Sequence, residues 1–374
     1  MEIKSFYMHF PYCIKKCNYC DFFRSVNHQM NFELYHQLLE ESQIKHVKLL
    51  DQYHSSMNKL KTFYLGGGTP SYWGQAGIIF LEKFFKKNKI IFEPDYEFTL
   101  EINPGSNLAS DMAGWSDLGV NRYSVGIQSL NPFFLKILDR IHSKQDALQL
   151  IETLAKEKKS YSVDFILGLP YSQDHKRDIC FELAEVLTFD PDHISMYILN
   201  VDKNYPYFNS LPEEEWIVDE YLLASSFLKN NGFVHYEVSN WAKKDKFSKH
   251  NLNYWKLGNW TALGPSASGN LFHGLNGEGI RYTWNNEKPS YYLEHLDNKK
   301  HKLEKLFMGL RTSYGIDPED IFSKTELELF INIVGKWQKA GFANVAGRIV
   351  SLSDRGFLML NSLLDEVFMK ITTF

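Results

Sequence analysis

Short apolar runs alternate with longer stretches of helical periodicity over residues 1–205. In the longer stretches apolar positions recur every three or four residues, which is typical of an amphipathic helix packed against a core. The apolar runs predict six strands, at Ser5–Phe10, Thr62–Leu65, Glu97–Ile102, Arg122–Ile127, Tyr161–Leu167 and His193–Leu199. The periodic stretches predict helices at Phe32–Leu50, Gln75–Lys86, Pro132–Leu138, Gln145–Lys156 and Asp174–Leu187.

This repetition of strand and helix predicts the fold class. A strand followed by a helix and a second strand implies a right-handed crossover and a parallel sheet, so we expect an α/β protein. A closed barrel of this kind has eight strands, and six units are too few to close it. We expect an incomplete (β/α)6 parallel barrel, with ligands at the C-terminal ends of its strands.

The rest of the chain departs from this pattern. The polar stretch Asp202–Glu215 leads into a predicted helix at Glu214–Asn230, and Phe247–Trp284 shows little periodicity and predicts long ordered loops. From Ser290 the pattern is mostly helical with a two-strand ending near Ile349–Leu352, for which a winged-helix domain is a candidate form. The predicted domains are a partial barrel at 1–205, a connecting region at 206–289 and a helical C-terminal domain at 290–374.

Composition narrows the classes of protein to which the chain can belong. Its 374 residues are 44% apolar and 23% charged, as in an ordinary globular protein with a sizeable core. The formal net charge of −4, from 41 Lys+Arg and 45 Asp+Glu, argues against a broad basic face for nucleic acid. Neither a signal peptide nor an apolar run of membrane-spanning length occurs, so we expect a cytoplasmic protein. Aromatic residues reach 15%, a surplus that suits a flat apolar ligand.

Three of the four cysteines are clustered directly after the first predicted strand. Cys13, Cys17 and Cys20 form a CxxxCxxC pattern, which excludes a disulfide framework and suits a metal site of reduced thiolates. A structural zinc site is the alternative, but it takes four closed ligands, and the only other cysteine is the distant Cys180. Three clustered thiolates favour a 4Fe–4S cluster with one open iron.

The cysteine segment and several later motifs resemble a known family. YMHFPYCIKKCNYCDF (Tyr7–Phe22) looks like the first motif of the radical S-adenosylmethionine (SAM) enzymes. Further stretches resemble the oxygen-independent coproporphyrinogen oxidase-like group: FYLGGGTPS (Phe63–Ser71), LEINPGS (Leu100–Ser106), NRYSVGIQSLN (Asn121–Asn131), LDRIHS (Leu138–Ser143), VDFILGLP (Val163–Pro170) and HNLNYW (His250–Trp255). The resemblance implies that the open iron binds the amino and carboxylate groups of SAM. One electron from the cluster then cleaves SAM to methionine and a 5′-deoxyadenosyl radical.

The resemblance also implies which residues contact SAM. Gly67, Gly68 and Thr69 are expected to receive its amino group, and Glu101 its ribose hydroxyls. Arg140 can pair with its carboxylate through two hydrogen bonds. The remaining expected cofactor contacts are Tyr7, Tyr19, Gln128 and Asp164. Taken singly, each of these residues can equally serve a turn, a helix cap or the core. The assignment to SAM is supported because all of them are predicted to lie at the C-terminal ends of the strands.

Two features of the sequence, the residue at position 22 and the length before Tyr7, distinguish the branches of this group. Its coproporphyrinogen-oxidising enzymes carry a further cysteine at the position of Phe22 and an N-terminal extension that helps to hold substrate. Here Cys20-Asp21-Phe22 matches the haem-chaperone (HemW) branch, and the sequence begins six residues before Tyr7. The alternative is a radical SAM oxidoreductase of the oxygen-independent coproporphyrinogen III oxidase type, so the sequence leaves open whether the chain is an enzyme.

The HemW resemblance implies a protein that binds haem and delivers it to respiratory-chain apoproteins. A haem donor protein and a second copy of the chain are further candidate partners, and a peripheral position at the inner membrane is a candidate location. His250 can supply a ring nitrogen to the haem iron, while Tyr254 and Trp255 offer flat faces to the macrocycle. The alternative is that His250 only bonds to a loop and that Trp255 belongs to the core. The following stretch, Gly264-Pro-Ser-Ala-Ser268, lacks the family's second glycine and histidine, so no ligand is carried over there.

Overall fold

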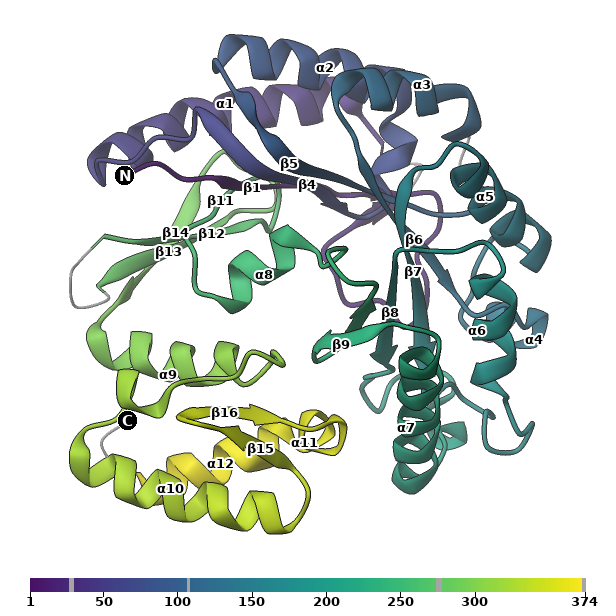
Figure 1. The fold of residues 1–374 in the computed structure, drawn as a ribbon. Helices are drawn as coiled ribbons and strands as arrows, with labels where there is room; N and C mark the ends of the chain where they lie inside the picture. The colour runs from purple at the N-terminus through teal and green to yellow at the C-terminus, as the bar shows by residue number, and fades with distance from the viewer. Residues whose placement is uncertain (27–29, 106–107, 274–277, 372–374) are drawn as a thin grey trace.

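A nine-stranded sheet forms the frame of the molecule, and helices cover its outer face (Figure 1). The structure is a computed structural model that describes residues 1–26, 30–105, 108–273 and 278–371. Six strands run parallel and side by side in chain order, namely β1 (Ser5–Phe10), β4 (Lys59–Gly67), β5 (Ile91–Ile102), β6 (Arg122–Gln128), β7 (Ser160–Leu167) and β8 (His193–Ile198). The predicted α/β fold with a six-unit parallel barrel is confirmed.

An aromatic core lies between this sheet and its helices. Phe6 stacks on Phe63 with ring centroids 5.2 Å apart, and Phe63 meets Phe98 edge-on at 4.7 Å. Alternate residues of the same strands point to the inner face of the sheet, because side chains alternate along a strand. The covering helices are α1 (Phe32–Gln52), α2 (Gly74–Lys87), α3 (Leu108–Leu118), α4 (Pro132–Ile137), α5 (Lys144–Lys156), α6 (Ile179–Leu187) and α7 (Glu214–Asn230).

Two of these helices differ from the sequence prediction. The α3 helix was not predicted, because its segment LASDMAGWSDL holds glycine, serine and aspartate residues that weaken the helical pattern. The α6 helix begins at Ile179 rather than Asp174. The side chain of Asp178 accepts a hydrogen bond from the Phe181 N–H and caps the helix there.

Three short strands extend the sheet beyond the six that the sequence predicted. β11 (Thr261–Leu263) pairs in parallel with β1, and β10 (Asn240–Ala242) pairs antiparallel with β8 and with the edge strand β9 (Val234–Glu237). The prediction of long loops over Phe247–Trp284 is therefore wrong. That stretch also contains α8 (Lys249–Trp255) and the strands β12 (Ser268–Phe272) and β13 (Gly279–Trp284). All three residues of β11 are buried, so the strand shows no alternation of apolar and polar positions that a sequence pattern can detect.

The C-terminal part has its own hydrophobic core. It consists of α9 (Asn298–Gly309), α10 (Lys324–Lys339), the hairpin β15 (Ala343–Ala346) and β16 (Ile349–Leu352), α11 (Asp354–Leu358) and α12 (Leu360–Lys370). Leu306, Phe330 and Val367 are fully buried within it. The part is mostly helical as predicted, but the two strands are not its ending, because α11 and α12 follow them.

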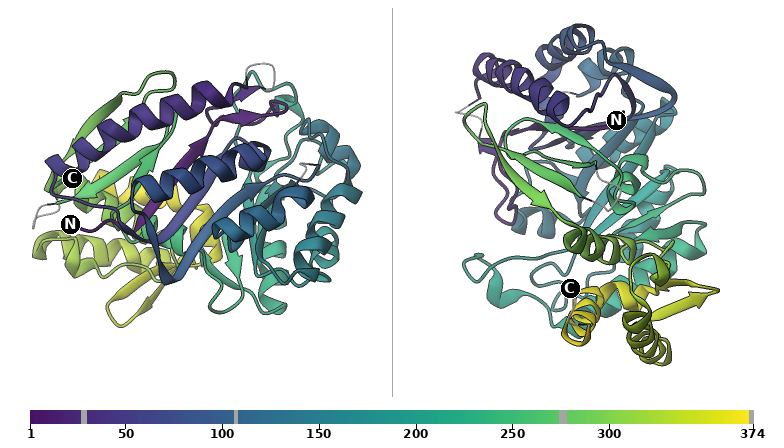
Figure 2. Two further views of the ribbon diagram at one scale, coloured as in Figure 1. Left: turned by 90° about the horizontal axis from the view of Figure 1, so that it is seen from above. Right: turned by 90° about the vertical axis from the view of Figure 1, so that its left-hand side faces the viewer.

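The predicted start of the C-terminal part at residue 290 also needs correction. Residues Tyr291–Leu296 form β14, which pairs with β13 in a three-stranded antiparallel sheet. The views in Figure 2 show the C-terminal helices beside one edge of the barrel, and the Val238 N–H donates to the Arg311 carbonyl at this junction. In the part of the chain that the structure describes, no helix is long and apolar enough to cross a bilayer.

Candidate functional site

A cavity of about 470 Å³ lies at the C-terminal ends of the parallel strands. Each of β4 to β8 contributes to its wall, and the loop that carries the cysteines closes one side. The predicted site residues that line it are Tyr19, Cys20, Gly67, Gly68, Thr69, Glu101, Gln128, Arg140 and Asp164. The structure therefore brings most of the predicted cofactor residues together. Ser106, the last residue of one quoted motif, lies outside the described residues.

All three clustered cysteines line a smaller pocket of about 70 Å³. Cys13 ends the short strand β2 (Tyr12–Cys13), which pairs with β3 (Ser25–Val26), and the loop between these strands carries Cys17 and Cys20. This pocket shares Tyr19, Cys20, Gly67, Gly68, Thr69, Asn103 and Arg140 with the large cavity. The two hollows are therefore parts of one site.

The chemistry around the thiols fits a metal cluster held on one side. Arg140 Nη1 and Thr69 Oγ1 each lie 3.7 Å from a sulfur, that of Cys17 and that of Cys13 respectively. Burial raises the pKa of the Cys13 and Cys20 thiols in the ligand-free protein, and the nearby positive charge of Arg24 opposes this rise. Among the described residues no three His, Cys, Asp or Glu side chains converge on a single ion, and the thiols instead line the pocket wall.

Glu101 is an acceptor at the end of β5, turned into the cavity. Its carboxylate oxygens accept hydrogen bonds from the Tyr64 hydroxyl at 2.9 Å and from the Gly67 N–H at 2.8 Å. Burial raises its pKa to about 7, although both hydrogen bonds oppose the rise. Gly67 has φ 118°, and a side chain there would meet His9 at 2.6 Å, so this position requires glycine.

Arg140 joins the cysteine loop to the ends of β5 and β6. Its Nη2 donates to Asn103 Oδ1 at 2.7 Å and to the Gly126 carbonyl. Its Nε is buried and has no hydrogen-bond partner. A buried guanidinium with a free N–H beside a cavity fits the binding of a carboxylate. A side chain at Gly126 would meet Asn103 at 2.8 Å and Gln128 at 3.0 Å, so glycine keeps this wall open.

Gln128 and Asp164 reach the cavity by different means. Gln128 has a left-handed φ of 68° at an irregularity where the β6–β7 register shifts by one residue. Such a bulge redirects a side chain at the end of a strand. Asp164 lies within β7, and its two oxygens accept from Ser162 Oγ at 2.7 Å and Ser124 Oγ at 2.8 Å. These bonds hold the carboxylate on the inner face of the barrel.

The two predicted tyrosines lie in different places. Tyr19 lines both hollows beside Arg140, and burial raises the pKa of its hydroxyl. Tyr7 is not among the residues that line the cavity. Its hydroxyl lies 2.9 Å from His9 Nδ1, deeper in the barrel, and its ring packs beside Tyr64. The expected contact of Tyr7 with SAM remains a prediction that this geometry does not favour.

The structure does not bring the segment His250–Trp255 to the cavity. His250 is only 1% exposed, with Nδ1 2.8 Å from Thr62 Oγ1 and Nε2 2.7 Å from Tyr254 Oη. Its ring stacks on Tyr64, and burial lowers its pKa to about 3. Trp255 lies beneath the guanidinium of Arg311, 5.8 Å from the ring centroid. Both His250 nitrogens are thus engaged within the protein. The expected contacts of His250, Tyr254 and Trp255 with haem remain predictions that this geometry does not favour.

The packing of α8 explains this placement. The Glu97 carboxylate, which comes from β5, accepts from the Lys249 N–H at 2.9 Å and the His250 N–H at 3.0 Å. Ser248 Oγ also donates to it at 3.3 Å. A buried carboxylate therefore caps the N-terminus of α8 and holds the helix inside the barrel.

Several residues of the cavity were missed by the sequence analysis. Asn103 follows the end of β5, Ser124 lies within β6, and Tyr197, Ile198 and Leu199 come from the end of β8. Asn103 stands two residues after Glu101 in a quoted motif, so alternation along the strand was a usable signal. No motif marked the end of β8, and its role follows only from the shape of the sheet.

Comparison with known proteins agrees with this geometry. The family model of the radical SAM superfamily matches residues 7–184. The haem chaperone HemW of Buchnera aphidicola subsp. Schizaphis graminum is 32% identical over 83% of this chain and 83% of its own length. HemW of Haemophilus influenzae is 35% identical over 71% and 70%. The mitochondrial radical SAM domain-containing protein 1 of Danio rerio is 30% identical over 99% and 88%.

A solved structure shares the fold. The coproporphyrinogen III oxidase HemN of Escherichia coli superposes with a TM-score of 0.79, covering 98% of this chain and 90% of its own. The two sequences are only 19% identical, so this likeness concerns the fold alone.

Proposed function

Because the chain belongs to the HemW family of radical SAM proteins, we propose that it is a haem chaperone. In this role it binds haem and passes it to an apoprotein of the respiratory chain. The observation that carries the proposal is the similarity to haem chaperones over most of the chain. The Cys20-Asp21-Phe22 stretch supports it, because the oxidase branch carries a further cysteine where this chain has Phe22.

The family implies a 4Fe–4S cluster and SAM, and we propose the residues that hold them. Cys13, Cys17 and Cys20 hold the cluster, which when bound supplies one electron to SAM. Arg140 binds the carboxylate of SAM through its free Nε–H, and Glu101 accepts from its amino or hydroxyl groups. Gln128 and Asp164 complete the polar wall. Tyr19 lies at the junction between the two hollows, since it lines both of them.

The second candidate function is an oxidoreductase of the coproporphyrinogen III oxidase type. The fold shared with HemN favours it, but at 19% identity that likeness carries only the architecture. Phe22 argues against this second function, because the oxidase branch carries a cysteine at that position.

The partners and the location of a chaperone are also part of the proposal. The partners are a haem donor, a respiratory acceptor and a second copy of the chain, and the location is cytoplasmic and peripheral to the inner membrane.

One sample tests the proposal against this alternative. The protein is reconstituted anaerobically with iron and sulfide, titrated with haem, and then supplied with SAM, a reductant and coproporphyrinogen III. We expect a saturable haem spectrum and no protoporphyrinogen. Formation of protoporphyrinogen by the wild-type protein would overturn the chaperone assignment and favour the oxidoreductase.

A further inference from the structure

The large cavity has two walls of opposite character. One wall is polar and consists of the residues proposed to bind SAM. The other is apolar and is made by Phe22, Ile166 and the end of β8, residues 197–199. Three of these residues are largely exposed, since Phe22 is 73%, Tyr197 46% and Ile198 38% exposed, and all three line the cavity. Large apolar side chains gathered at the mouth of a cavity indicate a binding surface.

We propose that haem binds on this apolar wall, with its macrocycle flat against Phe22 and the end of β8. The inference rests on the proposed function and gives it a site. It also replaces the expectation that His250, Tyr254 and Trp255 contact haem. His250 and Tyr254 are bonded to each other inside the barrel, and Trp255 faces Arg311.

The chemistry of this wall matches haem more closely than a polar ligand. A porphyrin is a flat apolar disc with carboxylates along one edge, and it needs apolar contact on its face and a cation near that edge. Arg24 supplies the cation beside Phe22. Its Nη1 donates to the Phe22 carbonyl at 2.6 Å and its Nη2 to the Cys17 carbonyl at 3.4 Å, so the guanidinium lies between Phe22 and the cysteine pocket. Asp21 carries a negative charge at the mouth of the large cavity, whereas Arg24 lines the adjoining cysteine pocket. We therefore expect the carboxylates of haem to point away from Asp21 and toward Arg24.

Part of the apolar wall, at Ile166 and Leu199, packs on a buried cluster. Ile166 belongs to a small buried cluster with Phe134, Ile137, Leu138 and Leu169, and Leu199 and Tyr19 pack against that cluster. Tyr19 also borders the cysteines, so the apolar wall and the cluster pocket share a neighbour. A preformed wall loses little entropy when a rigid ligand binds to it.

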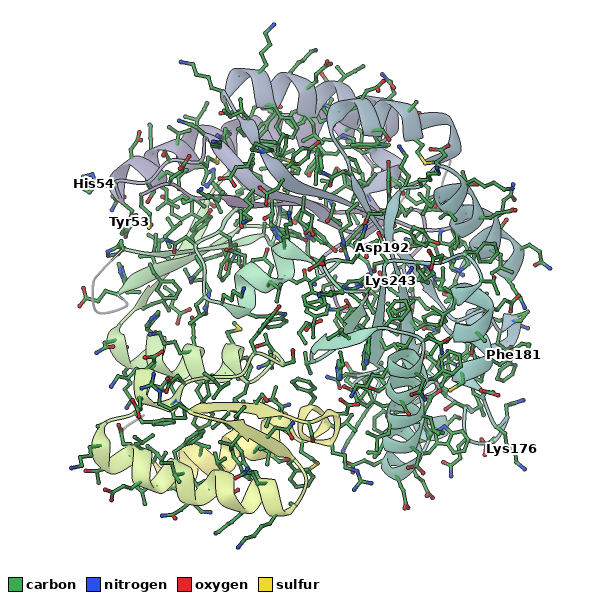
Figure 3. All side chains as sticks on the ribbon, in the orientation of Figure 1. Tyr53, His54, Lys176, Phe181, Asp192 and Lys243 are labelled. Carbon is green, nitrogen blue, oxygen red and sulfur yellow. The ribbon has the colours of Figure 1, made fainter. Side chains whose placement is uncertain are left out.

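A matched pair of variants tests this site. Phe22→Ser removes an exposed phenyl ring from the apolar wall, and Phe181→Ser removes a ring that is 67% exposed on α6, away from the cavity (Figure 3). Haem is titrated into the cluster-reconstituted wild-type protein and both variants, and the Soret absorbance is followed. We expect Phe22→Ser to weaken haem binding about tenfold or more, because a buried aromatic contact is lost. Phe181→Ser should bind as the wild type does.

Two further measurements complete the test. SAM affinity and the cluster absorbance should be unchanged in Phe22→Ser. His250→Ala should unfold at a lower temperature and still give the wild-type Soret band. Equal haem affinity in the wild type, Phe22→Ser and Phe181→Ser would overturn the proposed site and leave the chaperone function standing. Loss of the Soret band in folded His250→Ala would show that haem binds at α8 instead of the apolar wall. Absence of haem binding by the wild-type protein would overturn both this site and the proposed chaperone function.

Discussion

At the scale of single residues, the site depends on groups whose charge is set by burial. The cysteine thiols and Glu101 lie in the two adjoining hollows of one site, and burial raises the pKa of Cys13, Cys20 and Glu101 in the ligand-free protein. Each of these groups is therefore less ionised near neutral pH than it would be in water. A bound cation favours the ionised form of each, so binding at this site is coupled to the release of protons.

Replacement of a clustered cysteine should abolish the metal centre. We expect Cys13→Ala, Cys17→Ala or Cys20→Ala to lose most iron and sulfide after anaerobic reconstitution, because the cluster needs all three thiolates as ligands. Cys180→Ala is the control, since Cys180 lies on α6 and packs against the main core. Full iron content in any of the first three variants, measured with the absorbance of the cluster, would contradict the assignment.

The pKa of Glu101 predicts how SAM binding depends on pH. Its pKa of about 7 in the ligand-free protein means that the carboxyl is mostly protonated at pH 6 and mostly ionised at pH 8. The ionised form is the better acceptor, so SAM affinity should rise across this interval. In Glu101→Gln the affinity should be lower and this part of the pH dependence should vanish. Isothermal titration at several pH values measures both effects.

The same shift has a consequence for stability, with a definite sign. The folded pKa lies above the ordinary value of 4.5, so the folded protein binds this proton more tightly than the unfolded chain. The contribution of Glu101 to stability is present below pH 4.5 and is lost as the pH rises through 7, by at most about 3 kcal/mol. Glu101→Gln should therefore gain stability relative to the wild type at pH 8 but not at pH 4.

At the scale of elements, a buried ion network holds the ends of β6 and β7. Glu182 on α6 accepts from Ser129 Oγ at 2.6 Å and from the Leu130 N–H, directly after Gln128. Arg177 bonds to Glu182 at 2.7 Å and to the Ile166 carbonyl at 2.6 Å. Both charged side chains are nearly inaccessible to solvent. The network therefore fixes the bulge that turns Gln128 into the cavity.

A double-mutant cycle tests whether Glu182 acts through Gln128. We expect Glu182→Gln and Gln128→Ala each to weaken SAM binding severalfold, as for the loss of a hydrogen bond, and the double variant to bind no worse than Gln128→Ala. Glu220→Gln is the control, because Glu220 meets the same Arg177 but bonds to the Gly168 N–H. It should lower the melting temperature and leave SAM affinity within about twofold. Additive losses in the double variant would show that Glu182 affects SAM binding by a route that does not involve Gln128.

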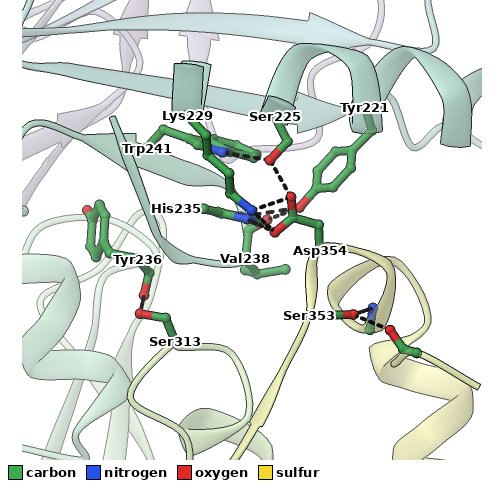
Figure 4. Close-up of polar contacts among 12 residues, drawn as sticks. Tyr221, Ser225, Lys229, His235, Tyr236, Val238, Trp241, Ser313, Ser353 and Asp354 are labelled. Carbon is green, nitrogen blue, oxygen red and sulfur yellow. Dashed lines mark hydrogen bonds and ion pairs between the residues drawn. The ribbon is translucent and has the colours of Figure 1, made fainter. Parts of the chain in front are cut away.

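At the scale of the whole molecule, a polar junction ties the C-terminal part to the barrel (Figure 4). Asp354, at the start of α11, accepts from Ser225 Oγ and Lys229 Nζ of α7 at 2.6 Å each, and its Oδ1 lies 2.9 Å from His235 Nδ1 on β9. Trp241 stacks on His235 with ring centroids 3.9 Å apart. The hydrogen bond from His235 and those from Lys229 and Ser225 hold the pKa of Asp354 well below its usual range, although burial opposes them.

Loss of this junction should loosen the C-terminal part. Asp354→Ala leaves a buried histidine and a lysine without their acceptor, so we expect destabilisation of about 3 kcal/mol. A carboxyl with a lowered folded pKa stabilises above its unfolded value of 3.8, and this contribution is lost as the pH falls below it. Thermal unfolding and limited proteolysis near residue 311 should both show the effect at pH 7. The difference between wild type and variant should shrink at pH 3.

The sequence by itself determined the frame of the barrel and most of its polar wall. Strand–helix periodicity located six parallel strands. Because such strands end at one edge, the motif residues Gly67, Glu101 and Gln128 had to meet there. The clustering of the cysteines is local in sequence and needed no knowledge of packing. These features depend on spacing along the chain, which a sequence displays directly.

Only the tertiary structure determined the position of α8 inside the barrel, the three added strands β9, β10 and β11, and the apolar wall of the cavity. The HNLNYW motif lies in a stretch predicted to form loops. In the structure Glu97 from β5 caps it as a helix, and the Thr62 hydroxyl from β4 forms a hydrogen bond with His250 inside the barrel. The strands β9, β10 and β11 are too short to show a period, and Tyr197 carries no motif. In each case the deciding contact joins residues far apart in the chain, and the direction of a side chain follows from what packs against it rather than from its neighbours in sequence.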